Sequence, residues 1–334
     1  MFCCASTWFF IGTLCAIFIP IILTLYLTGN IVVLPEVTKL LLVAVWCYID
    51  ALLNLIFPRK CKSIEGLTAV VTGGGHGIGK EIALGFARRG VKVVLWDINE
   101  ENMQKVADEI KSLNGQAFSY VCDVTDKEKV YEIARKVKDD VGNVDILVNN
   151  AGTVVGKNLL SSSDKEIEKT MNINLMAHFW TIKAFLNEML ERDSGHIVAI
   201  SSILSVLGAC QLVDYCTSKS GVSMMMESLR QEVLSQKKHG VHFTTILPSK
   251  VNTGLFEGAK GRFSAIPPTI QPEYAANRII EAIERNEIKV VLPPWFGLIL
   301  ALKPFLPQKL IDAATRFAGL ETGMKEFTGH KKAI

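Results

Sequence analysis

The sequence predicts an α/β protein in which helices cover both faces of a parallel, seven-stranded sheet, preceded by an N-terminal helical segment that anchors the chain to a membrane. From Leu67 onward, short β-branched runs alternate seven times with segments of helical period, which is typical of a doubly wound sheet. The predicted strands are continuous apolar runs, as burial on both faces requires. Residues 1–60, by contrast, carry only five charged side chains, which are Glu36, Lys39, Asp50, Arg59 and Lys60.

Charge and composition exclude two broad classes of protein. Lys and Arg number 36 and Asp and Glu number 33, so the net charge is only +3, without the basic excess of a general nucleic-acid binder. Apolar residues make up 49% of the chain, which is too many for a disordered protein. The mean hydropathy of +0.29 is high for a soluble enzyme, and the sparsely charged first 60 residues account for it.

The membrane anchor is predicted from two apolar stretches near the N-terminus. Residues 8–27 form a run of 20 residues without a charge, close to the ~20 residues that cross ~30 Å of hydrocarbon. Residues 40–57 contain Asp50 and Asn54, and we expect them either to span the membrane or to lie in its interface. A cleaved signal peptide is the competing interpretation, disfavoured because no basic residue precedes the first run. Basic residues within 58–62 favour a cytosolic position for the domain that follows.

The elements of that domain follow one another in regular order. We predict strands at residues 68–73, 91–97, 117–124, 145–152, 196–202, 241–248 and 288–293. We predict helices at residues 77–90, 99–113, 126–141, 164–191, 214–236 and 272–285. Residues 249–271 interrupt the alternation with a glycine- and proline-containing loop, and a loop of that length is usually a lid or a binding loop. Residues 290–306 are apolar but contain prolines, which indicates a surface element that packs on the domain or dips into a bilayer.

A glycine-rich turn joins the first predicted strand to the first predicted helix. Glycines at this place let the backbone approach a pyrophosphate, and the helix N-terminus stabilises its negative charge. Asp97 ends the second strand, 18 residues after Gly79, where a carboxylate accepts hydrogen bonds from the ribose hydroxyls of NAD and repels the extra phosphate of NADP. The sequence therefore predicts a dinucleotide site of the Rossmann type that prefers NAD. A protonated His76 would instead favour binding of the extra phosphate of NADP.

Tyr215 and Lys219 lie one helical turn apart at the start of a predicted helix and share one face. A tyrosine with an ordinary pKa near ~10 is a poor base at neutral pH, and a neighbouring ammonium lowers that pKa. The pair therefore suits general acid/base catalysis of an alcohol–carbonyl interconversion. Ser202 ends a strand 13 residues earlier, and ligands bind beyond the carboxyl ends of parallel strands. We therefore expect Ser202 to hydrogen-bond the substrate oxygen.

Taken together, these motifs resemble the short-chain dehydrogenase/reductase superfamily, from Leu67 to Pro293. The resemblance rests on TGGGHGIG (72–79), Asp123, NNAG (149–152), Asn174, Ser202, Tyr215, Lys219 and P-x-x-V-x-T (248–253). It implies that Tyr215 is the catalytic acid/base, that Lys219 lowers its pKa, and that Ser202 positions the substrate oxygen. It also implies that Asn174 holds a water in a proton relay to Lys219. The family commonly has Pro-Gly where this chain has Pro248-Ser249.

The same resemblance implies a set of cofactor contacts. Asp123 would contact the adenine, Asn150 the adenosine side of the cofactor, and Val251 and Thr253 the nicotinamide amide. The full set is Thr72, Gly73, Gly75, His76, Gly77, Ile78, Gly79, Asp97, Asp123, Val124, Asn150, Ala151, Gly152, Tyr215, Lys219, Pro248, Val251 and Thr253. The expected cofactor is NAD, with NADP as the alternative.

Three further segments resemble one subgroup of the superfamily, the membrane-associated retinol dehydrogenases and the lipid-droplet 17β-hydroxysteroid dehydrogenases. These segments are LWDIN (95–99), AHFWTIKAFL (177–186) and DYCTSK (214–219). We therefore expect a membrane-anchored oxidoreductase that interconverts an apolar alcohol (retinol, a hydroxysteroid or a lipid alcohol) and its carbonyl. One alternative is an NADPH-dependent reductase of retinal or ketosteroids. Another is a non-catalytic membrane or droplet scaffold.

The predicted organisation is an anchor over residues 1–60, a Rossmann-fold dehydrogenase domain over 61–294 and an apolar C-terminal extension over 295–334. The substrate pocket is expected from the apolar stretches 203–213 and 254–270. The expected location is the endoplasmic reticulum membrane or the lipid droplet, with the catalytic domain in the cytosol. Expected partners are an apolar small molecule, membrane lipid and a second copy in a homodimer, but no nucleic acid. No histidine pairs with cysteine or carboxylate at ligand spacing, so no catalytic metal is expected.

Overall fold

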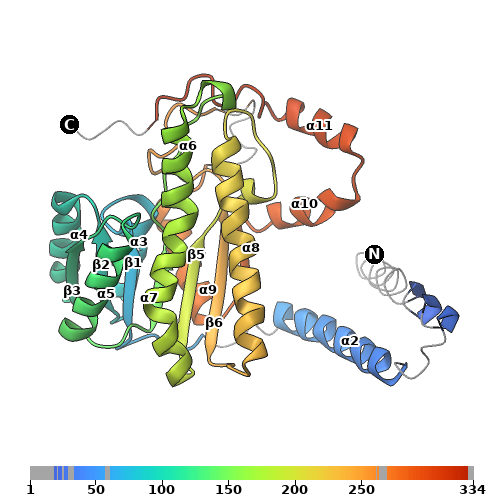
Figure 1. The fold of residues 1–334 in the computed structure, drawn as a ribbon, viewed down its shortest axis with the longest axis horizontal. Coiled ribbons are helices and arrows are strands. Elements are labelled where there is room, and N and C mark those ends of the chain that lie inside the picture. Colours follow the sequence, from blue (N-terminus) through green and yellow to red (C-terminus); the bar gives the residue numbers. More distant parts are fainter. Residues whose placement is uncertain are drawn as a thin grey trace. The chain divides into compact units, whose positions relative to one another are not determined.

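The computed structural model describes residues 19–20, 22–24, 26–28, 34–56, 61–260, 262 and 269–329. The chain divides into two units, Met1–Lys60 and Cys61–Ile334 (Figure 1). Most of the apolar run predicted over residues 8–27 lies outside the described residues, as do residues 58–60 of the basic stretch and the tail after residue 329.

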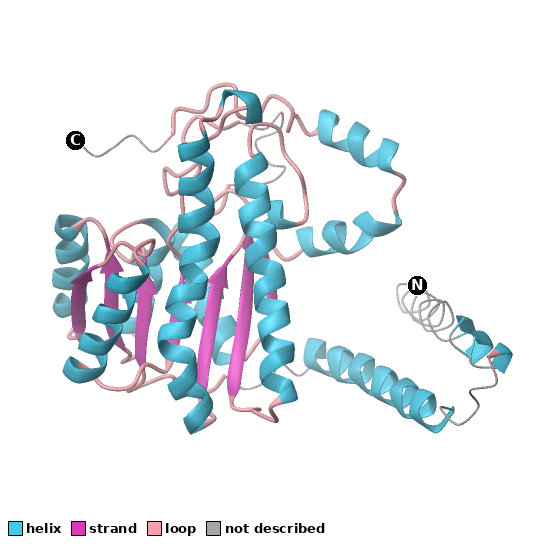
Figure 2. Ribbon diagram, in the orientation of Figure 1, coloured by secondary structure: helices cyan, strands magenta, loops and turns pink. Residues whose placement is uncertain are grey.

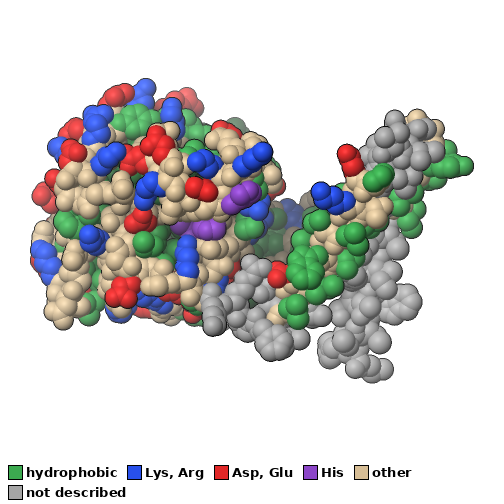
Figure 3. All heavy atoms as spheres, turned by 90° about the horizontal axis from the view of Figure 1, so that it is seen from below, with side chains coloured by type: hydrophobic (Ala, Val, Ile, Leu, Met, Phe, Trp, Pro, Cys, Tyr) green, Lys and Arg blue, Asp and Glu red, His purple; other side chains and the backbone are tan. Residues whose placement is uncertain are grey.

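The N-terminal unit contains one long described helix, α2, Leu34–Ile56. It begins six residues before the second predicted apolar stretch. Its large apolar side chains are largely exposed, with Leu42 at 66% and Trp46 at 65%, and Figure 3 shows such side chains gathered along this unit. Within the ranges that the structure describes, no helix combines the length and the apolar character needed to cross a membrane. The anchor over residues 1–60 therefore stays a prediction.

The larger unit is built on a seven-stranded sheet in the order β3-β2-β1-β4-β5-β6-β7, with every neighbouring pair parallel (Figure 2). The strands are β1 Thr68–Thr72, β2 Lys92–Asp97, β3 Ala117–Val121, β4 Ile146–Asn149, β5 Gly195–Ile200, β6 Val241–Pro248 and β7 Lys289–Leu292. This confirms the doubly wound parallel sheet predicted from the alternation. The strand order reverses between β1 and β4, and such a switch point is where sheets of this type bind ligands.

Helices cover the two faces of the sheet and close two apolar cores. The helices are α3 Gly77–Ala87, α4 Glu100–Ser112, α5 Lys127–Asp140, α6 Asp164–Met171, α7 Ala177–Arg192, α8 Val213–Ser235 and α9 Pro272–Glu284. The core on one face contains side chains of α3, α4 and α9, and the core on the other contains side chains of α5, α7 and α8. Val70 and Val71 are adjacent in β1, yet each belongs to a different core, because strand side chains alternate between faces.

The long helix predicted over residues 164–191 changes geometry at its middle. α6 runs into a π-helical turn, η3 Asn172–Met176, before α7 begins. No proline or glycine marks the change in the sequence. The Asn174 side chain within the turn is held by the backbone of Thr153, a residue 21 positions earlier. Turns of this kind are frequent at functional sites, and this one borders the site described below.

The C-terminal part contains more helix than the sequence predicts. The apolar stretch 290–306 forms the end of β7, then α10 Phe296–Leu302 and a single turn, η5 Lys303–Phe305. A further helix, α11 Gln308–Phe317, follows within the segment expected to be only an extension. Part of the predicted loop 249–271, residues 261 and 263–268, lies outside the described residues.

Candidate active site

The carboxyl ends of the central strands border one large cavity of about 2170 Å³ in the second unit. It extends from the glycine turn after β1 to the chain segment that follows α11. Most of the predicted site residues line it: Gly73, His76, Gly77, Ile78, Asp97, Asp123, Val124, Asn150, Ala151, Gly152, Ser202, Tyr215, Lys219, Pro248, Val251 and Thr253. The other four predicted site residues do not line the cavity but support residues that do. They are Thr72, Gly75, Gly79 and Asn174.

The turn after β1 needs its glycines for two physical reasons. Gly73 and Gly77 have φ angles of +64° and +58°, in the left-handed region that favours glycine. A Cβ atom on Gly79 would lie 2.1 Å from the Gly73 carbonyl oxygen, so the first turn of α3 packs directly on the loop. The result is bare backbone, with the N-terminus of α3 at the cavity. This is the cradle that a pyrophosphate group requires.

A set of hydrogen bonds clamps the end of β1 to the end of β4. The Thr72 hydroxyl oxygen accepts from the backbone N–H groups of Asn150 and Ala151, at 3.0 and 3.1 Å. The Asn150 side-chain amide donates to the carbonyl oxygens of Thr72 and Gly73, at 3.0 and 3.2 Å. These bonds place residues 150–152 along the cavity wall. Thr72 therefore supports the site from behind, out of reach of a ligand.

Two carboxylates stand at the ends of neighbouring strands. Asp97 ends β2, and its oxygens accept from the backbone N–H groups of Gly75 and Asn99, at 2.9 and 3.0 Å. Asp123 follows β3 and accepts from the backbone N–H and the hydroxyl of Thr125, at 2.9 and 2.7 Å. Backbone N–H donors hold both side chains in fixed orientations at the cavity. Asp97 thus presents negative charge directly beside the glycine turn.

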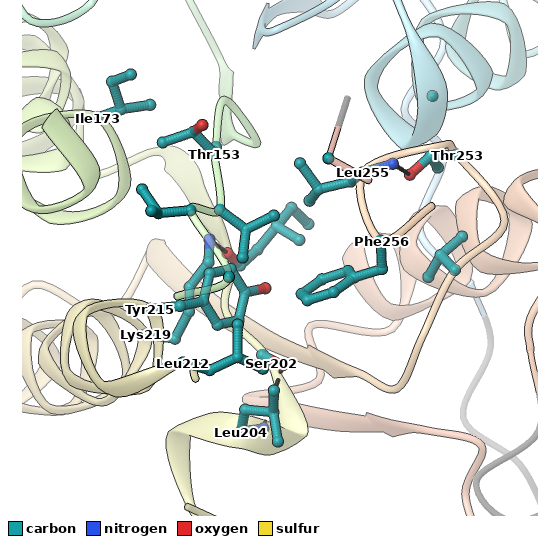
Figure 4. A pocket seen from close by; sticks show the side chains of 18 of the residues that line it. Thr153, Ile173, Ser202, Leu204, Leu212, Tyr215, Lys219, Thr253, Leu255 and Phe256 are labelled. Atoms are coloured by element: carbon teal, nitrogen blue, oxygen red, sulfur yellow. Dashed lines mark hydrogen bonds between the residues drawn. The ribbon is translucent and has the colours of Figure 1, made fainter. Parts of the chain in front are cut away.

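Ser202, Tyr215 and Lys219 lie together at the inner wall of the cavity (Figure 4). All three are buried, with exposures of 6%, 5% and 4%. A side-chain hydrogen bond links Ser202 and Tyr215. The Lys219 ammonium donates to the carbonyl oxygen of Ile200 at 2.7 Å and lies 5.9 Å from the centroid of the Tyr215 ring. The predicted juxtaposition of these residues is therefore present in the fold.

Burial dominates the electrostatics of this group. It raises the pKa of Tyr215 above its ordinary value, and the hydrogen bond with Ser202 opposes that rise only in part. It lowers the pKa of Lys219 to about 8, so the ammonium is still mostly charged at neutral pH. The sequence predicted that the Lys219 ammonium lowers the pKa of Tyr215. In the folded chain burial instead raises this pKa, because only the hydrogen bond with Ser202 opposes desolvation of the phenol.

Asn174 lies behind the cavity wall. Its side-chain oxygen accepts from the Thr153 N–H at 2.8 Å, and its amide donates to the Thr153 carbonyl and the Ser218 hydroxyl, at 2.9 and 3.1 Å. The Ser218 hydroxyl in turn donates to the Tyr215 carbonyl at 2.7 Å. Asn174 therefore ties the loop after β4 to the helix that carries Tyr215 and Lys219.

Several cavity residues were not predicted from the sequence, because they lie far along the chain from the other site residues. Met324 and Phe327, in the segment after α11, pack in one apolar cluster with Tyr215 and Leu212. This segment is held by the loop after β6: the N–H of Lys260 donates to Gly323 at 2.8 Å, and the N–H of Thr328 donates to Glu257 at 3.1 Å. No local pattern signals such pairing. Residues of both stretches expected to form the pocket also line the cavity, among them Leu204, Leu207, Leu212, Leu255 and Phe256.

Comparisons with known proteins identify the family of the chain. A family model described as short chain dehydrogenase matches residues 67–261. The chain is 37% identical over 286 residues to short-chain dehydrogenase/reductase 3 of Homo sapiens, covering 85% of this chain and 94% of that protein. It is also 37% identical over 287 residues to epidermal retinol dehydrogenase 2 of Homo sapiens, covering 86% of this chain and 93% of the relative. It is 36% identical over 310 residues to retinol dehydrogenase 10-B of Danio rerio, covering 86% of this chain and 92% of that protein.

Solved structures show the same fold. A short chain dehydrogenase/reductase from Burkholderia phymatum in complex with NAD has a TM-score of 0.66 at 24% identity, over 72% of this chain and 93% of that one. An alcohol dehydrogenase from Thermococcus sibiricus complexed with 5-hydroxy-NADP has a TM-score of 0.60 at 25% identity, over 67% and 94%. The chain therefore belongs to the short chain dehydrogenase family and is an NAD(P)-dependent oxidoreductase that acts on alcohols.

Proposed function

We propose that this protein interconverts an apolar alcohol and its carbonyl compound, with NAD as the preferred cofactor. The observation that carries the proposal is the grouping of Ser202, Tyr215 and Lys219 in a buried corner of the cavity that also contains the glycine turn. Geometry of this kind brings one hydroxyl donor, one acid/base and one cation to the same small volume. An alcohol oxidation needs these groups beside a hydride acceptor.

The residues at the cavity fit a nicotinamide dinucleotide. The bare backbone of residues 73–79 suits the pyrophosphate, because a Cβ at Gly79 would fill the turn. Asp97 would accept from the adenosine ribose, Asp123 and Val124 would contact the adenine, and residues 150–152 would flank the adenosine. Tyr215 and Lys219 would hold the nicotinamide ribose, and Pro248, Val251 and Thr253 the nicotinamide. The cofactor, when bound, supplies the hydride acceptor or donor.

The chain's own residues handle the oxygen and its proton. The hydroxyls of Ser202 and Tyr215 hold the substrate oxygen from two sides. During oxidation the phenolate form of Tyr215 takes the hydroxyl proton and becomes a neutral phenol. During reduction the phenol gives its proton to the carbonyl oxygen and becomes the phenolate. The charge of Lys219 stabilises the phenolate in both directions, because an ammonium nearby favours the anion. Asn174 holds Ser218 and the loop after β4 in place and belongs to the path by which protons reach Lys219.

The preference for NAD rests on Asp97. Its carboxylate is held by two backbone N–H groups beside the glycine turn, so it cannot easily move away from a ligand. A second phosphate on the ribose would meet that negative charge.

Apolar side chains around Tyr215 support an apolar substrate. Leu204, Leu212, Phe256, Met324 and Phe327 surround the phenol and share one cluster with it. Burying apolar surface against such a wall contributes roughly 25 cal/mol per Å². Relatives of the chain that carry the name retinol dehydrogenase point to the same class of alcohol. We also propose that residues 1–60 attach the enzyme to the endoplasmic reticulum membrane or to lipid droplets, where such alcohols dissolve.

The test is turnover by the full-length protein in detergent, with retinol, estradiol and long-chain alcohols, each with NAD and with NADP. Oxidation of at least one apolar alcohol with NAD preferred is the expected result. A clear preference for NADPH with retinal or a ketosteroid would replace the proposal with the reductase alternative. Binding of NAD without turnover of any of these substrates would favour a scaffold role.

A further inference from the structure

A second, smaller hollow lies between the loop after β6 and the segment that follows α11. Its volume is about 480 Å³, and it adjoins the active-site cavity, since Lys260, Arg262 and Gly323 line both. Two of its described lining residues belong to the loop, and the other six lie between the last turn of α11 and position 326. We call it the basic hollow, and its lining is Lys260, Arg262, Arg316, Gly319, Thr322, Gly323, Lys325 and Glu326.

Positive charge dominates the basic hollow. Four of its lining side chains are cationic and one, Glu326, is anionic, which leaves a net charge of +3. The Lys260 ammonium pairs with the Glu326 carboxylate at 2.6 Å, and this hydrogen bond raises the pKa of Lys260. The Arg262 guanidinium lies over the Phe317 ring, 5.3 Å from its centroid. The ring contact leaves the guanidinium charged, so the excess of positive charge remains.

The other two cations of the hollow are Arg316 and Lys325. Their exposed side chains make no hydrogen bond or ion pair with any residue that the structure describes. Arg316 lies in the last turn of α11, where a cation stabilises the helix end. Lys325 lies in a turn beyond the helix, and the remaining two cations belong to the loop after β6. The end of α11 therefore does not explain why four cations gather here.

Backbone contacts join the two sides of the hollow. The Lys260 N–H donates to the Gly323 carbonyl at 2.8 Å, and the Arg262 N–H donates to the Ala318 carbonyl at 3.2 Å. Gly319 has a φ of +75°, and a Cβ atom on it would lie 2.7 Å from the Cβ of Arg262, so the two chain segments approach closely. The backbone that carries the cations is thus fixed before a ligand arrives, which lowers the entropic cost of binding.

We propose that the basic hollow binds a phosphate group through its four cationic side chains. A phosphate monoester carries a charge of about −1.5 to −2 near pH 7 and has three acceptor oxygens, which suits cations that come from two chain segments. Guanidinium groups match phosphate oxygens bidentately. The ion pair between Lys260 and Glu326 is no obstacle, because its side chains are 72% and 67% exposed and exposed pairs contribute little stability. A carboxylate, with one charge and two oxygens, fits less well.

The two chain segments that border the hollow also form part of the wall around Tyr215. Ala259 and Met324 pack in the apolar cluster of Tyr215, and each is followed directly by a lysine of the hollow. A phosphate bound to both segments would offset the repulsion between their cations and so hold this wall in place. We therefore expect phosphate to lower the KM for an apolar alcohol. This consequence rests on the proposed function, whereas phosphate binding itself does not.

The experiment is isothermal titration calorimetry of inorganic phosphate with the full-length protein in a neutral detergent, at constant ionic strength. Lys325→Gln should raise the Kd for phosphate by roughly fivefold, because one cation of the hollow is lost. Lys309→Gln, at an exposed position of α11 outside the hollow, removes the same charge and should leave the Kd unchanged. The glycine turn is the same in all three proteins, so phosphate bound there does not affect the comparison. Equal Kd values in all three proteins, or no binding by the wild type, would overturn the proposal.

A second set of titrations identifies the source of the phosphate group. Phosphatidic acid is added to the detergent micelles, and oleate, an anionic lipid without phosphate, controls for the surface charge. If phosphatidic acid raises the apparent Kd for inorganic phosphate more than oleate does, a lipid headgroup occupies the basic hollow. If the two lipids act alike while Lys325→Gln still weakens phosphate binding, the ligand is a soluble phosphate. Both results support the site.

The link to the active site is measured by the KM for a long-chain alcohol, with and without phosphate at constant ionic strength. Phosphate should lower this KM by roughly fivefold in the wild type, at the low end of the usual coupling between two sites, and less in Lys325→Gln. Phosphate binding with an unchanged KM would contradict the effect on the wall. Phosphate binding without turnover of any alcohol would contradict the proposed function and leave the basic hollow supported, and turnover without phosphate binding would do the reverse.

Discussion

Phe256 meets Tyr215 edge to face, with ring centroids 5.3 Å apart and ring planes at 88°. Tyr215 belongs to the first turn of α8, and Phe256 belongs to the loop after β6. The loop therefore touches the proposed acid/base directly. Aromatic pairs in this geometry contribute about 0.5–1.5 kcal/mol beyond their buried area. The contact couples the position of the loop to the position of the phenol.

Replacing Phe256 should weaken substrate binding more than chemistry. Phe256→Ala removes an apolar wall of the cavity, so the KM for an apolar alcohol should rise about five- to tenfold, since 1.4 kcal/mol corresponds to a factor of ten. Steady-state kinetics measure it, and Phe179→Ala, at a 40% exposed position on α7, is the control. A fall in kcat with an unchanged KM would place Phe256 in the chemical step.

Tyr215→Phe should abolish turnover while NAD binding survives. General acid/base groups typically contribute ~10²–10⁴-fold, and the ring of phenylalanine preserves the packing on Phe256. Turnover and NADH fluorescence titration measure the two quantities. Tyr274→Phe removes an exposed hydroxyl on α9 and should change neither. Near-normal turnover of the Tyr215 variant would remove this residue from the mechanism.

Asp97→Ser should relax the preference for NAD over NADP. Loss of the carboxylate removes the repulsion of a ribose phosphate, and the ratio of the two kcat/KM values should shift by on the order of tenfold, about 1.4 kcal/mol. Asp108→Ser, at an exposed position on α4, controls for a general change of charge. A wild-type protein that already uses NADP better than NAD would contradict the role given to Asp97.

Gly156→Ala should disturb the segment after α11. A Cβ at this position would lie 2.4 Å from the Phe327 ring, and the residue has a φ of +72°. Phe327 must then move, and Met324 with it, so the KM for apolar alcohols should rise while the Kd for NAD stays the same. Gly142→Ala is the matched control, because its φ is +104° with open space around the Cβ. If both variants behave alike, backbone strain and not the Phe327 contact is responsible.

Acid should destabilise the fold below pH 6.5 through buried histidines. Burial and the nearby Lys219 lower the pKa of His178 to about 3, and neither of its ring nitrogens has a hydrogen-bond partner among the described residues. Burial, with Lys62 close by, also lowers the pKa values of His196 and His242. Between pH 6.5 and about 3 the unfolded chain binds a proton at His178 that the folded chain does not, so stability falls as pH falls.

The size of this effect can be measured by urea unfolding. His178 alone should lower the unfolding free energy by about 2 kcal/mol when the pH falls from 7 to 5. His178→Gln cannot take up that proton, so its unfolding free energy should change less over the same range, whatever its value at pH 7. The same pH dependence in both proteins would show that His178 is not the titrating group.

Local patterns in the sequence were enough to predict the framework of this protein. The alternation of apolar strands and amphipathic helices predicted the parallel sheet, because strands that are buried on both faces consist of continuous apolar residues. The glycine turn and Asp97 were found the same way, since glycine is the residue favoured at the positive φ angles of residues 73 and 77. Likewise, Tyr215 and Lys219 are one turn apart, and a helix brings such residues to one face.

Contacts between distant residues were decided by the tertiary structure alone. The π-helical turn depends on hydrogen bonds between Asn174 and Thr153. The placement of Met324 beside Tyr215 depends on backbone hydrogen bonds of residues 257, 260 and 262 with residues 328, 323 and 318. Periodicity records which face of an element is buried, but not which distant segment covers it. Burial in the folded chain likewise sets the pKa directions of Tyr215 and Lys219, because desolvation comes from every segment packed around them.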